Sequence, residues 1–103
     1  ERLVFVAGQV PMRDGKPAGD DIASQTHYTL DLIAAILQDA GCTLDDVVKT
    51  TVWLVDAADY PGFNDAYAER FPAATAPARS TVIAGLIAPV KVEIEAIALR
   101  RAR

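Results

Sequence analysis

Cysteine and histidine are nearly absent from this chain of 103 residues, which has one of each, Cys42 and His27. A single cysteine cannot form a disulfide within the chain, and one Cys with one His makes a poor ligand set for a structural zinc. The two residues also stand on or just beyond the same expected helix, with no Gly-x-Ser-x-Gly elbow elsewhere. We therefore expect no metal and no covalent catalysis.

Long apolar runs and glycine-rich phosphate loops are also lacking. The longest strictly apolar run is only a few residues, far short of the roughly 20 residues that cross a bilayer. No basic and then apolar signal segment opens the chain, and no phosphate loop or dinucleotide fingerprint is present. The sequence predicts a cytoplasmic protein with no organic cofactor and no membrane partner.

Positive charge is in the minority. The chain has ten Lys and Arg against fourteen Asp and Glu, which gives a net charge of −4. Such a charge repels a polyanion at long range, so general binding of nucleic acid is disfavoured. The exception is a basic tail, Arg100, Arg101 and Arg103, which we interpret as a solvated chain end.

A hydrophobic content of 51% suits one domain, spanning residues 1–103. Because the chain opens on Glu1 and a strand follows almost at once, we expect some N-terminal sequence to be missing. Residue patterns predict strands at 3–7, 47–55, 79–84 and 90–99. They also predict a helix at 21–40 and a second helix that starts near Asp59. The order β, α, β, α, β, β, with the helices on one side, suggests an α+β sandwich.

Two of these strands should expose different chemistry on their two faces. The last strand presents Glu93 and Glu95 opposite an apolar face, and two carboxylates within a hydrophobic strand are unexpected. We expect Glu95 to pair with Lys49 across the sheet rather than to act in catalysis. The strand at 47–55 should be central, with one face made by Val48, Thr50, Val52 and Leu54 and the other by Lys49, Thr51, Trp53 and Val55.

A sparse polar set remains as the candidate site: Arg79, Glu93 and Asn64. The planar fork of Arg79 suits a small carboxylate, which it can hold through two parallel hydrogen bonds. An interface pair of Arg79 with Glu93 or Glu95 is an equally good interpretation. For Asn64, local capping is favoured over a role in binding.

Several motifs occur in one order along the chain and with a common spacing. They are Ala7-Gly8-Gln9-Val10-Pro11, residues 25–41, Val47-Val48-Lys49-Thr50-Thr51-Val52, Asp59-Tyr60, Phe63-Asn64, Tyr67, Phe71, Pro77-Ala78-Arg79-Ser80 and Val92-Glu93-Ile94-Glu95-Ala96-Ile97-Ala98. Together they resemble the RidA/YjgF family of reactive-intermediate deaminases, over essentially the whole chain.

The resemblance implies a chorismate-mutase-like α+β fold, with helices on one face of a mixed sheet and three copies packed as a trimeric barrel. It implies active sites between subunits and no metal or organic cofactor. The implied enzyme is an enamine/imine deaminase, a hydrolase that converts 2-aminoacrylate and other 2-imino acids to 2-keto acids and ammonia. The implied partners are a small imino or keto acid and two further copies of the chain.

Residue roles follow from the resemblance as well. Arg79 is expected to grip the substrate carboxylate, helped by the backbone amide of Thr81, while Glu93 orients the attacking water. Asn64 is expected to line the pocket, and Gly8 to leave room for the ligand. The family also carries an N-terminal strand with a Tyr that closes the site, which would precede Glu1.

One departure from the family pattern bears on function. Ala7 stands where the deaminases commonly have Ser, so a hydroxyl is absent from the pocket. This favours a second hypothesis, a trimer that binds small acids or regulates a partner without turnover. We rank deamination first and non-catalytic binding second. A ribonuclease activity comes third, because the chain is acidic and has no histidine in the expected site.

Overall fold

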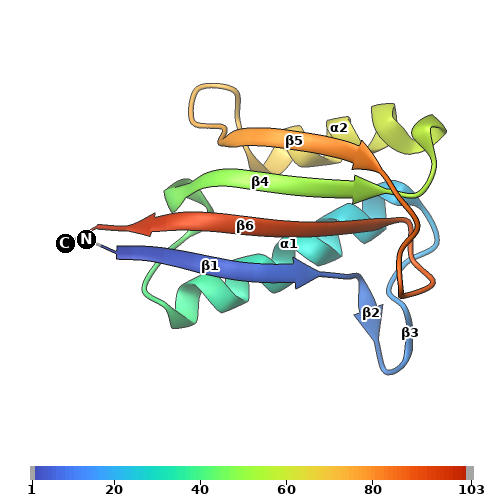
Figure 1. Cartoon of the computed structure of the whole chain (residues 1–103), viewed down its shortest axis with the longest axis horizontal. Coiled ribbons are helices and arrows are strands. Elements are labelled where there is room, and N and C mark those ends of the chain that lie inside the picture. The colour runs from blue at the N-terminus through green and yellow to red at the C-terminus, as the bar shows by residue number, and fades with distance from the viewer. Residues whose placement is uncertain (1, 102–103) are drawn as a thin grey trace.

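The computed structural model describes residues 2–101 and shows one four-stranded sheet with two helices behind it (Figure 1). The strand order is β1-β6-β4-β5, in which β4 and β5 run parallel and the other pairs antiparallel. The strands are β1 (Arg2–Gln9), β4 (Val47–Leu54), β5 (Ala78–Ile83) and β6 (Val92–Arg100). The expected α+β class with a mixed sheet is confirmed, and β4 is an inner strand as predicted.

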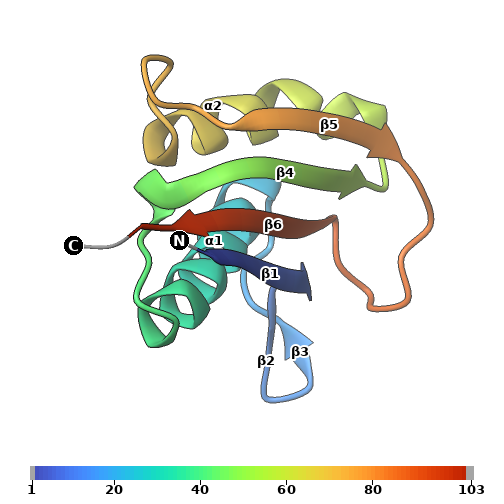
Figure 2. The same ribbon diagram turned by 60° about the vertical axis from the view of Figure 1, so that its left-hand side comes forward.

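A small hairpin, for which the sequence patterns predicted no strands, follows β1. Its strands are β2 (Met12–Arg13) and β3 (Lys16–Pro17), and the turn between them places Asp14 at φ 52° and Gly15 at φ 79°. Two residues in this left-handed region are typical of a tight hairpin turn. The hairpin hangs below the main sheet (Figure 2).

Helix α1 (Ile22–Asp39) begins and ends where the sequence predicts. The Asp21 carboxylate accepts a hydrogen bond of 2.8 Å from the Ser24 amide, and hydrogen bonds from Ser24 hold the pKa of that carboxyl below its usual value. Gly41, at φ 79°, follows the last turn. Leu30 on this helix is buried in the core, whereas Ile36 is 38% exposed.

Helix α2 (Tyr60–Arg70) follows a short 3₁₀ turn at Ala57–Asp59 and lies beside α1 on the same side of the sheet (Figures 1 and 2). An ion pair of 2.8 Å between Arg70 Nη2 and Asp31 Oδ1 links the two helices. None of the helices within residues 2–101 is long and apolar enough to span a bilayer.

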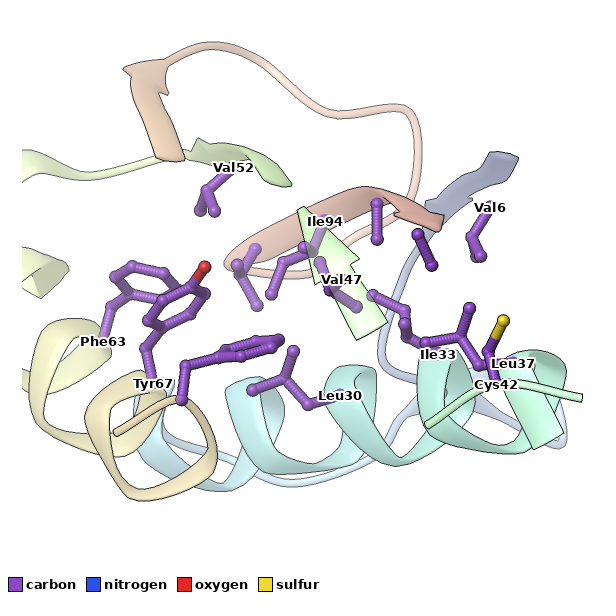
Figure 3. Packing of buried hydrophobic residues seen from close by; sticks show 14 of the residues in the cluster. Val6, Leu30, Ile33, Leu37, Cys42, Val47, Val52, Phe63, Tyr67 and Ile94 are labelled. Atoms are coloured by element: carbon purple, nitrogen blue, oxygen red, sulfur yellow. The ribbon is translucent and has the colours of Figure 1, made fainter. Parts of the chain in front are cut away.

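The core fills the space between the helices and the sheet, as Figure 3 shows. Phe63, Tyr67, Leu30 and Ile33 reach up from the helices toward Val52 and Ile94 of the sheet, among others. The apolar faces of α1 and α2 therefore pack against the apolar faces of β4 and β6.

The buried face of β4 differs from the prediction at its start. Val48 is 41% exposed and Val47 is 4% exposed, because the pairing with β6 is irregular between Val47 and Lys49. A bulge changes which residues point to the core. From Thr50 onward the alternation is as predicted.

The face of the sheet that turns away from the helices has no cover within residues 2–101. Large apolar side chains stand exposed on it, with Leu3 55%, Phe5 70% and Val82 45% accessible. We call this surface the open face of the sheet. Of the basic tail, Arg101 lies 3.5 Å from Asp46, while Arg103 lies outside the described residues.

Candidate active site

Arg79 lies on β5, the edge strand, and faces α2. Its guanidinium stands over three aromatic rings, at 5.8 Å from the ring centre of Tyr60, 5.3 Å from Phe63 and 4.8 Å from Tyr67. It also donates a hydrogen bond of 3.0 Å to the Tyr60 hydroxyl. These contacts hold the fork in place but leave its charge unneutralised.

No carboxylate pairs with Arg79 among residues 2–101. Within residues 2–101 of one chain Arg79 therefore forms no ion pair with Glu93 or Glu95, and a pair across an interface stays a prediction. An arginine that is partly buried, fixed by aromatic rings and free of a counter-ion is suited to bind an anion.

A hollow of about 580 Å³ opens beside this guanidinium, lined by Ala57, Tyr60, Arg79, Thr81 and Ile83. The Thr81 hydroxyl is buried and has no hydrogen-bond partner among the described residues. Below Arg79, Tyr67 and Thr50 share a buried hydrogen bond of 2.7 Å. Burial raises the pKa of Tyr67, while the bond to Thr50 and the charge of Arg79 oppose that rise.

Glu93 stands on the open face of the sheet. It lies opposite Trp53 on β4, and its carboxylate rests against Gly8 of β1. Neither Glu93 nor its neighbour Glu95 makes an ion pair or a side-chain hydrogen bond within residues 2–101. The expected pair of Glu95 with Lys49 is wrong, because Lys49 Nζ instead donates to the Thr50 carbonyl and the Thr51 hydroxyl.

Gly8 leaves space here for the flexible end of the Glu93 side chain, and its backbone has no positive φ. The pairing of β1 with β6 shifts between Val6 and Gln9, so Gly8 lies in a bulge. A Cβ on Gly8 would collide with Glu93 Oε2 and stand 3.1 Å from Glu93 Cδ. The room left by this glycine is thus filled by the Glu93 carboxylate itself.

The structure separates the expected site residues into two groups. Arg79 pairs with Thr50 of β4, and Glu93 pairs with Trp53, three residues further along that strand. Because side chains alternate between faces along a strand, an odd separation places them on opposite faces. Arg79 and Thr81 therefore share the hollow, and Glu93 and Gly8 share the open face.

Asn64 belongs to neither group. It is exposed in α2, one turn after Tyr60, and its side chain makes no hydrogen bond within residues 2–101. The expected capping bond is thus absent. Sequence reasoning missed Tyr60 as the partner of Arg79, although its spacing from Phe63 and Tyr67 follows one helical face.

A family model described as Endoribonuclease L-PSP matches residues 1–100. The chain belongs to this L-PSP/YjgF family. The resemblance stated from the sequence motifs is confirmed.

Relatives in the family carry different names. A 2-iminobutanoate/2-iminopropanoate deaminase of Escherichia coli is 43% identical over 105 residues, which cover 96% of this chain and 80% of that protein. A RutC family protein of Pyrococcus horikoshii is 43% identical over 101 residues, covering 95% of this chain and 79% of that protein. The crystal structure of yeast Mmf1 has a TM-score of 0.91 at 33% identity and covers 98% of this chain and 82% of that one.

The L-PSP/YjgF fold is therefore shown for this chain, and deaminases are among its relatives. No group of three or more Cys, His, Asp or Glu within residues 2–101 could hold a metal ion.

Proposed function

We propose that the chain hydrolyses 2-imino acids, and the enamines from which they form, to 2-keto acids and ammonia. The observation that carries the proposal is the Arg79 guanidinium, which is fixed by three aromatic rings and has no carboxylate partner within residues 2–101. The E. coli relative named as an imine deaminase supports the same activity.

Arg79 would bind the carboxylate of the substrate through two parallel hydrogen bonds. Its ring contacts and its bond to Tyr60 reduce the motion of a side chain that otherwise has many rotamers. A fixed donor fork loses little entropy when the ligand arrives. The hollow beside it is large enough for an acid of a few carbon atoms.

Glu93 would accept a hydrogen bond from water and direct its oxygen to carbon 2 of the imine. Attack forms a new C–O bond and moves the π electrons of the C=N bond to nitrogen, which takes up a proton. The proton that nitrogen takes up on attack comes from the water, which leaves a hydroxyl on carbon 2. As the C–N bond breaks, the hydroxyl proton also passes to nitrogen, so ammonia leaves and the keto group remains. Because an imine carbon is already electrophilic, binding, water placement and proton transfer suffice.

One chain does not bring these two groups together, since they lie on opposite faces of the sheet. We propose that a second copy completes each site, so that Arg79 at the β5 edge of one copy meets Glu93 on the open face of the next. The exposed Phe5 and Leu3 on that face support such contact. A closed ring of three copies, the trimeric barrel of the resemblance, joins each copy to the next in this way.

A second function, binding of small acids without turnover, is favoured by one observation. Ala7 is exposed beside Gly8 in the β1 bulge and brings no hydroxyl to the Glu93 side. In that case Arg79 would still bind a carboxylate, but water would not be activated.

The direct test is hydrolysis of 2-iminobutanoate, generated in solution by an amino-acid oxidase. We expect Arg79→Ala to slow it about a hundredfold or more, and Arg79→Lys, which keeps the charge but loses the fork, to restore only part. Arg13→Ala, at an exposed arginine outside the site, is the control and should be unchanged. If the parent protein does not accelerate the hydrolysis but does bind a 2-keto acid, the second function is established instead.

A further inference from the structure

Two buried hydroxyls lack a hydrogen-bond partner within residues 2–101, those of Thr26 and Thr81. Thr26 is 0% exposed on the core face of α1. Thr81 instead lines the hollow that holds the unpaired Arg79. Since a buried hydroxyl without a partner destabilises the folded chain, such a group beside a binding site suggests a ligand as the missing partner.

The place of Thr81 in the sheet brings its side chain next to the guanidinium. Arg79 and Thr81 are paired with Thr50 and Val52, both of which turn toward the helices. The side chains of Arg79 and Thr81 therefore point to one face of the sheet. Their Cα atoms are about 7 Å apart, which is the spacing of alternate residues in a strand. The long side chain of Arg79 can close part of that distance, so that one small anion could contact both residues.

We propose that the Thr81 hydroxyl donates a hydrogen bond to the carboxylate that Arg79 binds. The inference rests on the proposed function, and it concerns the side chain, whereas the resemblance assigns only the backbone amide of this residue. A rotation of about 120° around χ1 turns the hydroxyl from its buried position without moving the backbone. Thr81 would then add to the affinity for small 2-keto and 2-imino acids.

The proposal predicts opposite effects on binding and on stability. Thr81→Val keeps the branched shape and removes the hydroxyl, so the unliganded protein should melt at the same temperature or higher. Binding of 2-ketobutanoate, measured by calorimetry, should weaken about tenfold or more. Thr81→Ser keeps the hydroxyl and should bind within about threefold of the parent.

Thr26→Val is the matched control, because it removes the other unpartnered hydroxyl away from the hollow. Its affinity for 2-ketobutanoate should equal that of the parent. If Thr81→Val binds as tightly as the parent, or if it melts lower while Thr26→Val does not, the hydroxyl is structural and the proposal is overturned. A parent protein that binds no 2-keto acid would overturn it too.

Turnover separates this inference from the proposed function. If the parent binds 2-ketobutanoate through Thr81 but hydrolyses no imine, the deaminase proposal fails while the role of Thr81 stands. If the parent hydrolyses 2-iminobutanoate and Thr81→Val matches it in both KM and affinity for the keto acid, the deaminase proposal stands and the role of Thr81 fails.

Discussion

Arg79 and Glu93 point to opposite faces of the same sheet, because their partners on β4, Thr50 and Trp53, are three residues apart. The guanidinium faces α2 and its aromatic rings, while the carboxylate stands on the open face against Gly8. In the proposed mechanism, a water held by Glu93 and a carboxylate held by Arg79 of the same chain would be separated by the sheet. Catalysis by both residues would then require a second copy.

Substitution of Gly8 should lower activity by displacing Glu93. In Gly8→Ala the added Cβ would overlap the Glu93 carboxylate, so the water would be misplaced and kcat should fall about tenfold or more. Gly85→Ala is the matched control, because nothing lies within 4 Å of the position of its Cβ. Equal kcat values in 2-iminobutanoate hydrolysis for Gly8→Ala and the parent would contradict the role of this contact.

The oligomer should depend on the open face. Sedimentation equilibrium should give a mass of about 33 kDa, three chains of 11.0 kDa. Phe5→Asp places a charge on a side chain that is 70% exposed in one chain and should shift the mass toward that of the monomer. Ile36→Asp, on the outer side of α1 at 38% exposure, should not. A parent that sediments as a monomer would exclude a site shared between copies.

The sequence predicted most of the architecture because the hydrophobic periods of α1 and β6 are regular over many residues. Asp21 and Gly41 marked the ends of α1 through local chemistry alone. The exposure of Val48 was missed, since a bulge depends on the pairing of two distant strands and leaves little trace in one of them.

The candidate site was predicted as a set of residues but not as an arrangement. Residue types and motifs pointed to Arg79 and Glu93, whereas their separation by the sheet depends on the register with β4. Arg79 contacts the Tyr60 hydroxyl within one chain, and this contact likewise depends on how α2 packs on the sheet. Sequence spacing does not determine either.

Removal of both partners of the buried Thr50–Tyr67 hydrogen bond should cost less than the sum of the two single removals. Tyr67→Phe leaves the Thr50 hydroxyl unpaired, so the free energy of unfolding should fall by about 1–3 kcal/mol. The double variant with Thr50→Val should lose less than the sum of the single changes. Tyr28→Phe, at a half-buried tyrosine without this bond, is the control. Strictly additive losses in urea unfolding would contradict the coupling.

Stability at alkaline pH should reflect the raised pKa of Tyr67. Burial raises this pKa above the usual value for tyrosine, so the unfolded chain releases the phenol proton first as the pH rises. The stabilisation is complete below about pH 10 and is lost as the pH climbs from there through the folded pKa. Between about pH 9 and 11 the free energy of unfolding should fall more steeply for the parent than for Tyr67→Phe. If the free energy of unfolding falls equally with pH in the parent and in Tyr67→Phe, then Tyr67 has the same pKa in the folded and the unfolded chain.

Complementation between two inactive variants tests the shared site most directly. Arg79→Ala and Glu93→Gln would each be inactive alone, and the two are unfolded, mixed in equal amounts and refolded together. If each site takes Arg79 from one copy and Glu93 from the next, random assembly regenerates about one quarter of the sites, and a similar share of parent activity should return. If both residues act within one chain, the refolded mixture should stay as inactive as its components, and the proposed intersubunit site would be wrong.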